Sequence, residues 1–326
     1  MRPLSLKGHD RALTRVRFNR EGDLLFSAGK NKAPCVWYTE NGERIGTYEG
    51  HNGVVWDLDV SWDTKHIATA SGDNSVKLWN CETGECMNTI NQQTPARSVN
   101  MSFSGNLIAF TTMKMTKNQS SLCVYDIRDS DQMKEGGEPL FRIPFEVSAV
   151  CALFSTLDEK VTVGNETGKL MQYDFRNAEK CVASNELHRF GITDLQLSPD
   201  GAFIISSSKD KTAALFDVTN LNNLKQYRSE RPVNSACVSP IRDHIVLGGG
   251  EDAMQVTQTA VSAGHFEAKF YHMVFEEEFA RFKGHFGPIN TLAFHPDGNI
   301  VASGGEDGYV RVQEFDAEYL EFTYDY

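Results

Sequence analysis

The sequence predicts an all-β fold: a seven-bladed β-propeller formed by residues 1–326 and closed by an N-terminal outer strand. Three observations predict it. A fixed spacing of residue types, which we call the ruler, recurs along the chain. Each copy alternates apolar and polar residues between tight turns, and the N-terminal segment parallels a segment one copy further on. A chain of 326 residues exceeds the size that one open core supports, so a repeat fold is expected.

The ruler is clearest in four copies that begin with a histidine. An apolar residue follows nine positions after that histidine, Asn or Asp follows after 22, and Trp follows after 28 in the first two copies. Three further copies are placed by the apolar position, at Phe103, Phe154 and Val238. The copies then start near 9, 51, 94, 145, 188, 229 and 285, a spacing typical of four-stranded units. The long third and sixth intervals indicate insertions, and the sixth copy carries Glu251 and Thr257 at the Asp and Trp positions.

Within each copy the pattern is that of β-strands. Residues 54–60 read Val-Val-Trp-Asp-Leu-Asp-Val and alternate with a period of two. Ser198-Pro-Asp-Gly201 and His295-Pro-Asp-Gly298 predict tight turns, because Pro fixes φ and Gly permits a positive φ. Seven such units favour a propeller, which leaves only short sheet edges.

Two segments compete for the outer edge of the last blade. Residues 2–9 parallel residues 44–51 position by position, and residues 44–51 form the outer strand that leads into the second copy. The tail over residues 319–324 also alternates. The parallel favours the N-terminal segment as the closing strand.

Gly50-His51, Ser71-Gly-Asp73 and Val76-Lys-Leu-Trp79 resemble the WD-repeat family. The resemblance implies a buried, hydrogen-bonded tetrad in each well-formed copy: the His, a Ser or Thr of the second strand, the turn Asp and the Trp. The residues carried over are His51, Thr69, Asp73 and Trp79 in the second copy; His9, Ser27, Asn31 and Trp37 in the first; His188, Ser206 and Asp210 in the fifth; and His285, Ser303 and Asp307 in the seventh. The fifth and seventh copies have Phe216 and Gln313 in place of Trp, which weakens these tetrads without threatening the fold.

Composition and motifs exclude several classes of function. The His, Ser and Asp sets recur in four copies, whereas an active site is built once, so we predict structural sets, no enzyme and no cofactor. The seven cysteines include no C-x-x-C pair, which argues against a zinc ribbon or a disulfide framework and favours the cytoplasm. The net charge of −12, without a basic block, argues against direct nucleic-acid binding. No apolar run is long enough to cross a membrane.

The irregular stretch over residues 264–288 narrows the choice among WD-repeat proteins. Together with Gly248-Gly-Gly-Glu251, Arg231-Pro-Val-Asn234 and residues 304–311, it resembles the i subunits of eukaryotic translation initiation factor three. That resemblance implies a non-catalytic scaffold that binds the g subunit and a C-terminal helix of the b subunit. It implies that the small ribosomal subunit and messenger RNA are reached through the assembly. The alternatives are a WD-repeat adaptor of a receptor kinase and a stand-alone RNA-binding protein.

Two carboxylates are candidates for partner binding. In a blade, the turn after the first strand and the loop after the third strand lie on one face, which brings Asp200 and Asp217 of the fifth copy to the same rim. The family resemblance places the b-subunit helix beside the fifth and sixth blades, so we expect these residues to help hold it. The alternative is that each aspartate only stabilises its own turn.

Six aromatic residues crowd the sixth-copy insertion, which the spacing places at residues 258–283. They are Phe266, Phe270, Tyr271, Phe275, Phe279 and Phe282. Such a cluster can anchor a partner, and it can equally pack the insertion onto its own blade. We favour packing onto the blade.

Overall fold

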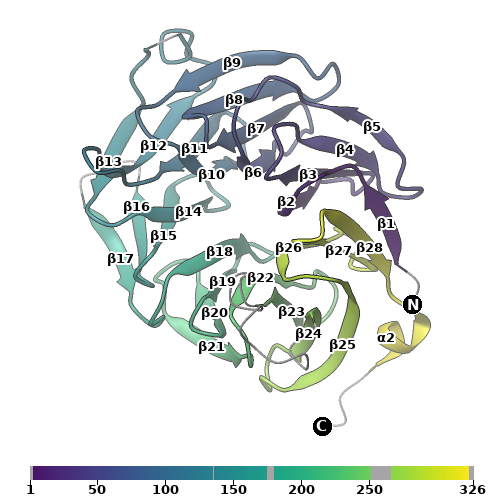
Figure 1. The fold of residues 1–326 in the computed structure, drawn as a ribbon. Coiled ribbons are helices and arrows are strands. Elements are labelled where there is room, and N and C mark those ends of the chain that lie inside the picture. The colour runs from purple at the N-terminus through teal and green to yellow at the C-terminus, as the bar shows by residue number, and fades with distance from the viewer. Residues whose placement is uncertain (1–2, 135, 175–179, 251–265, 323–326) are drawn as a thin grey trace.

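The computed structural model describes residues 3–134, 136–174, 180–250 and 266–322, and these form seven four-stranded antiparallel sheets arranged in a ring (Figure 1). A short C-terminal helix follows the last sheet. The predicted all-β, seven-bladed propeller is confirmed.

The first three blades are consecutive along the chain. Blade 1 consists of β2 (Leu13–Phe18), β3 (Leu24–Gly29), β4 (Cys35–Tyr38) and β5 (Arg44–Thr47). Blade 2 consists of β6 (Val55–Val60), β7 (His66–Ser71), β8 (Ser75–Asn80) and β9 (Cys86–Asn91). Blade 3 consists of β10 (Ala96–Met101), β11 (Leu107–Thr112), β12 (Ser120–Asp126) and β13 (Phe141–Phe145).

The remaining blades follow the same plan, except that the last one takes its outer strand from the N-terminus. Blade 4 consists of β14 (Ala149–Phe154), β15 (Lys160–Asn165), β16 (Leu170–Asp174) and β17 (Cys181–Asn185). Blade 5 consists of β18 (Ile192–Leu197), β19 (Phe203–Ser208), β20 (Thr212–Asp217) and β21 (Asn223–Arg228). Blade 6 consists of β22 (Val233–Val238), β23 (His244–Gly249), β24 (Phe266–His272) and β25 (Glu278–His285). Blade 7 consists of β26 (Ile289–Phe294), β27 (Ile300–Gly305), β28 (Tyr309–Glu314) and β1 (Leu4–Lys7).

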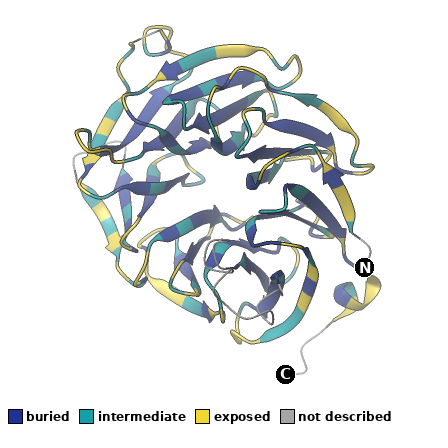
Figure 2. Cartoon of the chain, in the orientation of Figure 1, coloured by how far each residue is buried: buried dark blue, intermediate teal, exposed yellow. Residues whose placement is uncertain are grey.

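Burial decreases from the second strand of a blade to its outermost strand (Figure 2). In β7, every residue after His66 is buried, whereas β9 exposes three of its six residues. Both faces of an inner strand pack against neighbouring blades, so its sequence is apolar or small on both sides. The outermost strand meets solvent, which explains its polar residues.

The N-terminal segment closes the ring, as predicted. Leu4 pairs with Val312 and Leu6 with Val310, which makes β1 the fourth strand of the last blade. The competing expectation for the tail was wrong, because residues 317–321 form helix α2 (Ala317–Glu321) with Asp316 as its N-cap. β1 already occupies the position beside β28 that the tail would take, and a helix lets Tyr319 reach the buried aromatic rings of blade 6.

The ruler misplaces the start of the third copy and the later positions of the sixth. In blade 3 the position occupied by Val60 of blade 2 belongs to Met101, and Phe103 lies two residues further on, in an exposed turn. In blade 6 the predicted positions 251 and 257 lie outside the described residues. Tyr271, opposite Ile245, takes the place that Trp79 has opposite Ile67 in blade 2.

The crowded aromatic residues of the sixth copy belong to regular strands. Five of them lie in β24 and β25, and Phe275 lies in the turn between these strands. Phe270 and Phe282 are buried in blade 6 together with residues of α2 and the last blade.

No helix of the described residues has the length and apolar character that a membrane crossing needs.

Candidate partner-binding site

The second blade contains the most complete hydrogen-bonded tetrad. The His51 ring nitrogens lie 2.9 Å from Asp73 Oδ2 and 2.7 Å from Thr69 Oγ1. The Trp79 indole N–H donates to the same Thr69 oxygen at 2.8 Å. This oxygen therefore joins the His to the Trp, and the carboxylate fixes the other side of the imidazole.

The other three predicted sets are brought together with local differences. In blade 1, His9 lies 2.8 Å from Asn31 Oδ1 and 2.7 Å from Ser27 Oγ, which also accepts the Trp37 indole N–H at 2.8 Å. In blade 5, His188 lies 3.0 Å from Asp210 and 2.7 Å from Ser206, and the ring of Phe216 packs against it. In blade 7, His285 lies 3.0 Å from Asp307 and 2.8 Å from Ser303.

Blade 7 also contains a residue that sequence reasoning missed. The Arg311 guanidinium donates to Asp307 Oδ2 at 2.7 Å. Gln313 occupies the Trp position and cannot fill the same volume, and Arg311 contributes a charged hydrogen bond to the same Asp. The only signal in the sequence is a basic residue two positions before the Trp position, which is where blade 2 has Lys77.

The tetrads make the stability of the ring depend on pH. Burial lowers the pKa of His51 and His285, more than the aspartates beside them raise it. Burial would raise the pKa of Asp73, but hydrogen bonds from Ser75, the Asn52 N–H and His51 lower it below its usual range. The unfolded chain therefore binds more protons than the folded chain, first at the histidines below about pH 6.5 and then at the aspartates below about pH 4.

We expect the free energy of unfolding to fall as the pH is lowered from 7.5 to 5.5 and more steeply below pH 4.5. Urea unfolding followed by tryptophan fluorescence at each pH measures this dependence. Replacing His51 by Gln should flatten the upper part of the profile. A free energy of unfolding that is constant or rises between pH 7.5 and 5.5 would contradict the assignment of neutral histidines.

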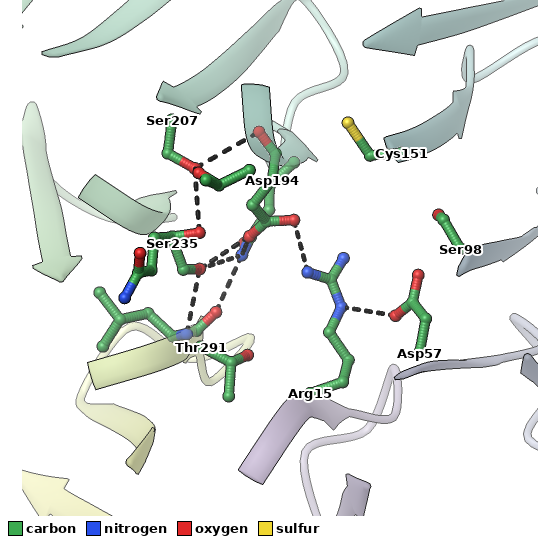
Figure 3. A network of polar contacts seen from close by, with 12 residues as sticks. Arg15, Asp57, Ser98, Cys151, Asp194, Ser207, Ser235 and Thr291 are labelled. Carbon is green, nitrogen blue, oxygen red and sulfur yellow. Dashed lines mark hydrogen bonds and ion pairs between the residues drawn. The ribbon is translucent and has the colours of Figure 1, made fainter. Parts of the chain in front are cut away.

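The innermost strands line the central axis with one ring of mainly polar residues. The third residue of each innermost strand points to this axis (Figure 3). These residues are Arg15, Asp57, Ser98, Cys151, Asp194, Ser235 and Thr291. Five of the seven are polar residues that lie six positions after a copy start that the ruler placed correctly. The ruler did not include this position.

Arg15 links blades across this ring. Its guanidinium lies 3.0 Å from Asp57 on the adjacent blade and donates to Asp194 on the fifth blade. Asp194 also accepts from the Ser235 hydroxyl at 2.7 Å. Burial raises the pKa of Asp194, but the charges of Arg15 and Arg17 and the hydrogen bonds from Arg15 and Gln196 together hold the pKa below its usual range.

Side chains of this ring also satisfy backbone groups of the next blade. Asp57 Oδ2 accepts the Val99 N–H at 3.1 Å, and Ser235 Oγ accepts the Leu292 N–H at 3.1 Å. Each such bond ties an innermost strand to its neighbour in the ring. The network therefore acts on the assembly of blades, and its carboxylates are occupied by Arg15 and by these donors.

The structure places Asp200 and Asp217 at the same end of blade 5. Asp200 lies in the turn between β18 and β19, and Asp217 ends β20 opposite Phe203 in the sheet. Because neighbouring strands are antiparallel, the turn between β18 and β19 and the loop after β20 share one edge of the blade. No direct contact joins the two carboxylates in the described structure.

Each carboxylate is held by its own turn. Asp200 accepts from the Ser198 hydroxyl and, at 3.1 Å, from the Ala202 N–H. Asp217 accepts the Thr219 N–H at 2.6 Å. Asp200 is exposed and Asp217 is half-buried, and within the described residues neither has a Lys or Arg nitrogen within 4.0 Å. Both therefore stabilise a turn, and in each the described hydrogen bonds engage only the Oδ1 oxygen.

Comparison with known proteins identifies the family. The EIF3I family model matches residues 1–325. Proteins named eukaryotic translation initiation factor 3 subunit I are similar along the whole chain: 69% identical in Caenorhabditis elegans and 66% in Brugia malayi, each covering 100% of both chains. The Drosophila melanogaster protein of the same name is 51% identical over 98% of this chain and 99% of its own. The resemblance seen in residues 264–288 is thus confirmed, and the chain belongs to the family of subunit I of eukaryotic translation initiation factor 3.

Proposed function

We propose that this chain is a non-catalytic scaffold subunit of translation initiation factor 3 that holds a helix of the b subunit through Asp200 and Asp217. The observation that carries the proposal is the pair of carboxylates at one end of blade 5, fixed by their own turns and, within the described residues, free of intramolecular cations. Fixed carboxylates with an exposed oxygen are suited to Arg or Lys of an incoming helix.

The same proposal covers the other partners. The chain would bind the g subunit as well, and it would reach the small ribosomal subunit and messenger RNA through the assembled factor in the cytoplasm. The net charge of −12 supports an indirect link to RNA, because phosphates are repelled by an acidic surface. The recurring tetrads and the buried ring network support a structural use of their His, Ser and Asp residues.

Replacing Asp200 and Asp217 together by Lys is expected to weaken binding of the C-terminal segment of the b subunit by at least about tenfold, because two attractive contacts become repulsive. Isothermal titration calorimetry with the purified segment measures the affinity. Thermal unfolding of the double variant should show at most a modest loss of stability, because the substitutions remove hydrogen bonds within two turns at the rim and leave the core unchanged.

Blade 7 offers a matched control. Asp297 occupies the turn of β26 and β27 that corresponds to the Asp200 turn, and its side chain is exposed. Asp297→Lys should leave the affinity within about twofold of the original. A loss of binding free energy in Asp297→Lys that is half the loss in the double variant would mean that net charge alone is responsible. An unchanged affinity of the Asp200 and Asp217 variant would overturn the proposed interaction.

A further inference from the structure

Two large aromatic side chains lie exposed and side by side on the turns of neighbouring blades. Trp62 is in the turn between β6 and β7, and Phe103 is in the turn between β10 and β11. They are 44% and 47% exposed, and their ring centroids are 4.3 Å apart. The Arg20 guanidinium, from the corresponding turn of blade 1, lies 4.7 Å from the Trp62 ring. We call the two adjacent rings of Trp62 and Phe103 the Trp62–Phe103 step.

We propose that the Trp62–Phe103 step is a docking surface for a basic segment of a partner protein that carries Arg or Lys and apolar side chains. The inference stands independently of the proposed interaction with the b-subunit helix. Trp and Arg are enriched at the few positions that dominate binding energy in protein interfaces. Adjacent exposed aromatic rings also mark interaction sites more often than single exposed ones do.

The turns that carry the step are fixed before any partner arrives. Asp158 of blade 4 accepts the backbone N–H groups of Phe103 at 2.6 Å and Ser104 at 2.8 Å, which locks the Phe103 turn to the next blade. In the Trp62 turn, Ser61 Oγ accepts the Lys65 and His66 N–H groups at 3.1 and 2.9 Å. A surface held this way loses little conformational entropy when it binds, which favours affinity.

The charge around the step selects the class of partner. The turns after the first and third strands of blades 1 and 2 carry seven carboxylates and two cations: Glu21, Asp23, Glu40, Glu43, Asp63, Glu82 and Glu85, with Arg20 and Lys65. Both cations lie near acids of their own turns, Arg20 at 3.9 Å from Glu21 and Lys65 at 3.1 Å from Asp63. The remaining carboxylates attract a basic segment and repel the phosphates of a nucleic acid.

The test uses the purified full chain and a fluorescein-labelled twelve-residue peptide of alternating Arg and Leu, with fluorescence anisotropy as the readout. Replacing Trp62 and Phe103 together by Ser leaves every charge in place. We expect this double variant to bind the peptide about tenfold more weakly than the unchanged chain. An Arg and Ser peptide should bind more weakly than the Arg and Leu peptide, and a Glu and Leu peptide should not bind.

The matched control removes two exposed aromatics at the opposite end of the blades. Phe190 and Phe286, which precede β18 and β26, are 63% and 86% exposed, and replacing both by Ser should leave peptide affinity unchanged. Equal losses in the control and in the Trp62 and Phe103 variant would overturn the proposal. The proposal would also be overturned if both variants bound the Arg and Leu peptide as tightly as the unchanged chain, because binding would then follow net charge alone.

Three further outcomes separate this surface from other occupants. If a single-stranded RNA oligonucleotide bound in a way that depends on Trp62 and Phe103, the occupant of the step would be a nucleic acid and not a basic protein segment. A dimer in sedimentation that becomes monomeric in the same variant would assign the step to a second copy of the chain. Loss of peptide binding in Asp200→Asn with Asp217→Asn, with full binding in the step variant, would move the basic segment to blade 5. Failure of the proposed interaction with the b-subunit helix would leave the expected peptide result unchanged.

Discussion

Replacing Arg15 by Ala is expected to lower the free energy of unfolding by about 3–5 kcal/mol, among the largest effects of any single substitution in this ring. Arg15 is nearly buried, with 11% of its side chain exposed, and it is the cation that faces both Asp57 and Asp194. Its removal leaves two buried carboxylates with hydrogen bonds but without the cation that contacts them directly. Urea unfolding monitored by circular dichroism measures the loss.

A second substitution separates the lost charge from the lost side chain. Adding Asp194→Asn to Arg15→Ala removes one of the stranded charges, so part of the stability should return. Arg128→Ala is the surface control, because Arg128 is exposed and pairs with Asp126 at the surface, and it should change the free energy of unfolding by less than about 1 kcal/mol. A loss of that small size for Arg15→Ala would mean that water screens the ring network.

The parts of the fold that depend on periodicity could be predicted from the sequence. The ruler located blades 1, 2, 5 and 7, because their His and Asp residues form side-chain hydrogen bonds that fix the residue types. The closing strand was predictable as well, because β1 occupies in blade 7 the place that β5 occupies in blade 1. Blade 3 lacks these polar residues, so the ruler could place it only by one apolar position, which was too little to fix its register.

The remaining misreadings have a common physical cause. The C-terminal tail alternates as a strand would, but β1 takes the edge of β28 beside which the tail was expected to pair. The pairing of Arg15 with Asp194 joins residues 179 positions apart, and no local pattern reveals such a contact. For the partner site, spacing alone placed Asp200 and Asp217 at one end of blade 5, whereas the exposure of Phe103 followed only from the corrected register of blade 3.

Replacing Trp79 by Ala is expected to lower the free energy of unfolding by about 3–5 kcal/mol. Trp79 is fully buried, and its ring packs against Tyr48 and His51 at centroid distances of 5.8 Å in each case. The substitution leaves a large cavity between the first two blades and removes the indole N–H that Thr69 accepts. Chemical unfolding followed by circular dichroism measures the change.

Two companion variants of the Trp79 experiment separate volume from hydrogen bonding. Trp79→Phe keeps a six-membered aromatic ring but loses the indole N–H and part of the buried volume. Blade 5 already uses Phe216 at this position, so a loss of about 1–2 kcal/mol is expected, smaller than that of Trp79→Ala. Trp62→Ala removes an exposed indole and should cost less than about 1 kcal/mol. If Trp79→Phe were as damaging as Trp79→Ala, the hydrogen bond to Thr69 would be the dominant contribution. A Trp79→Ala loss no larger than that of Trp62→Ala would show that blades 1 and 2 repack around the cavity, so that the tetrad Trp is dispensable where its neighbours can move.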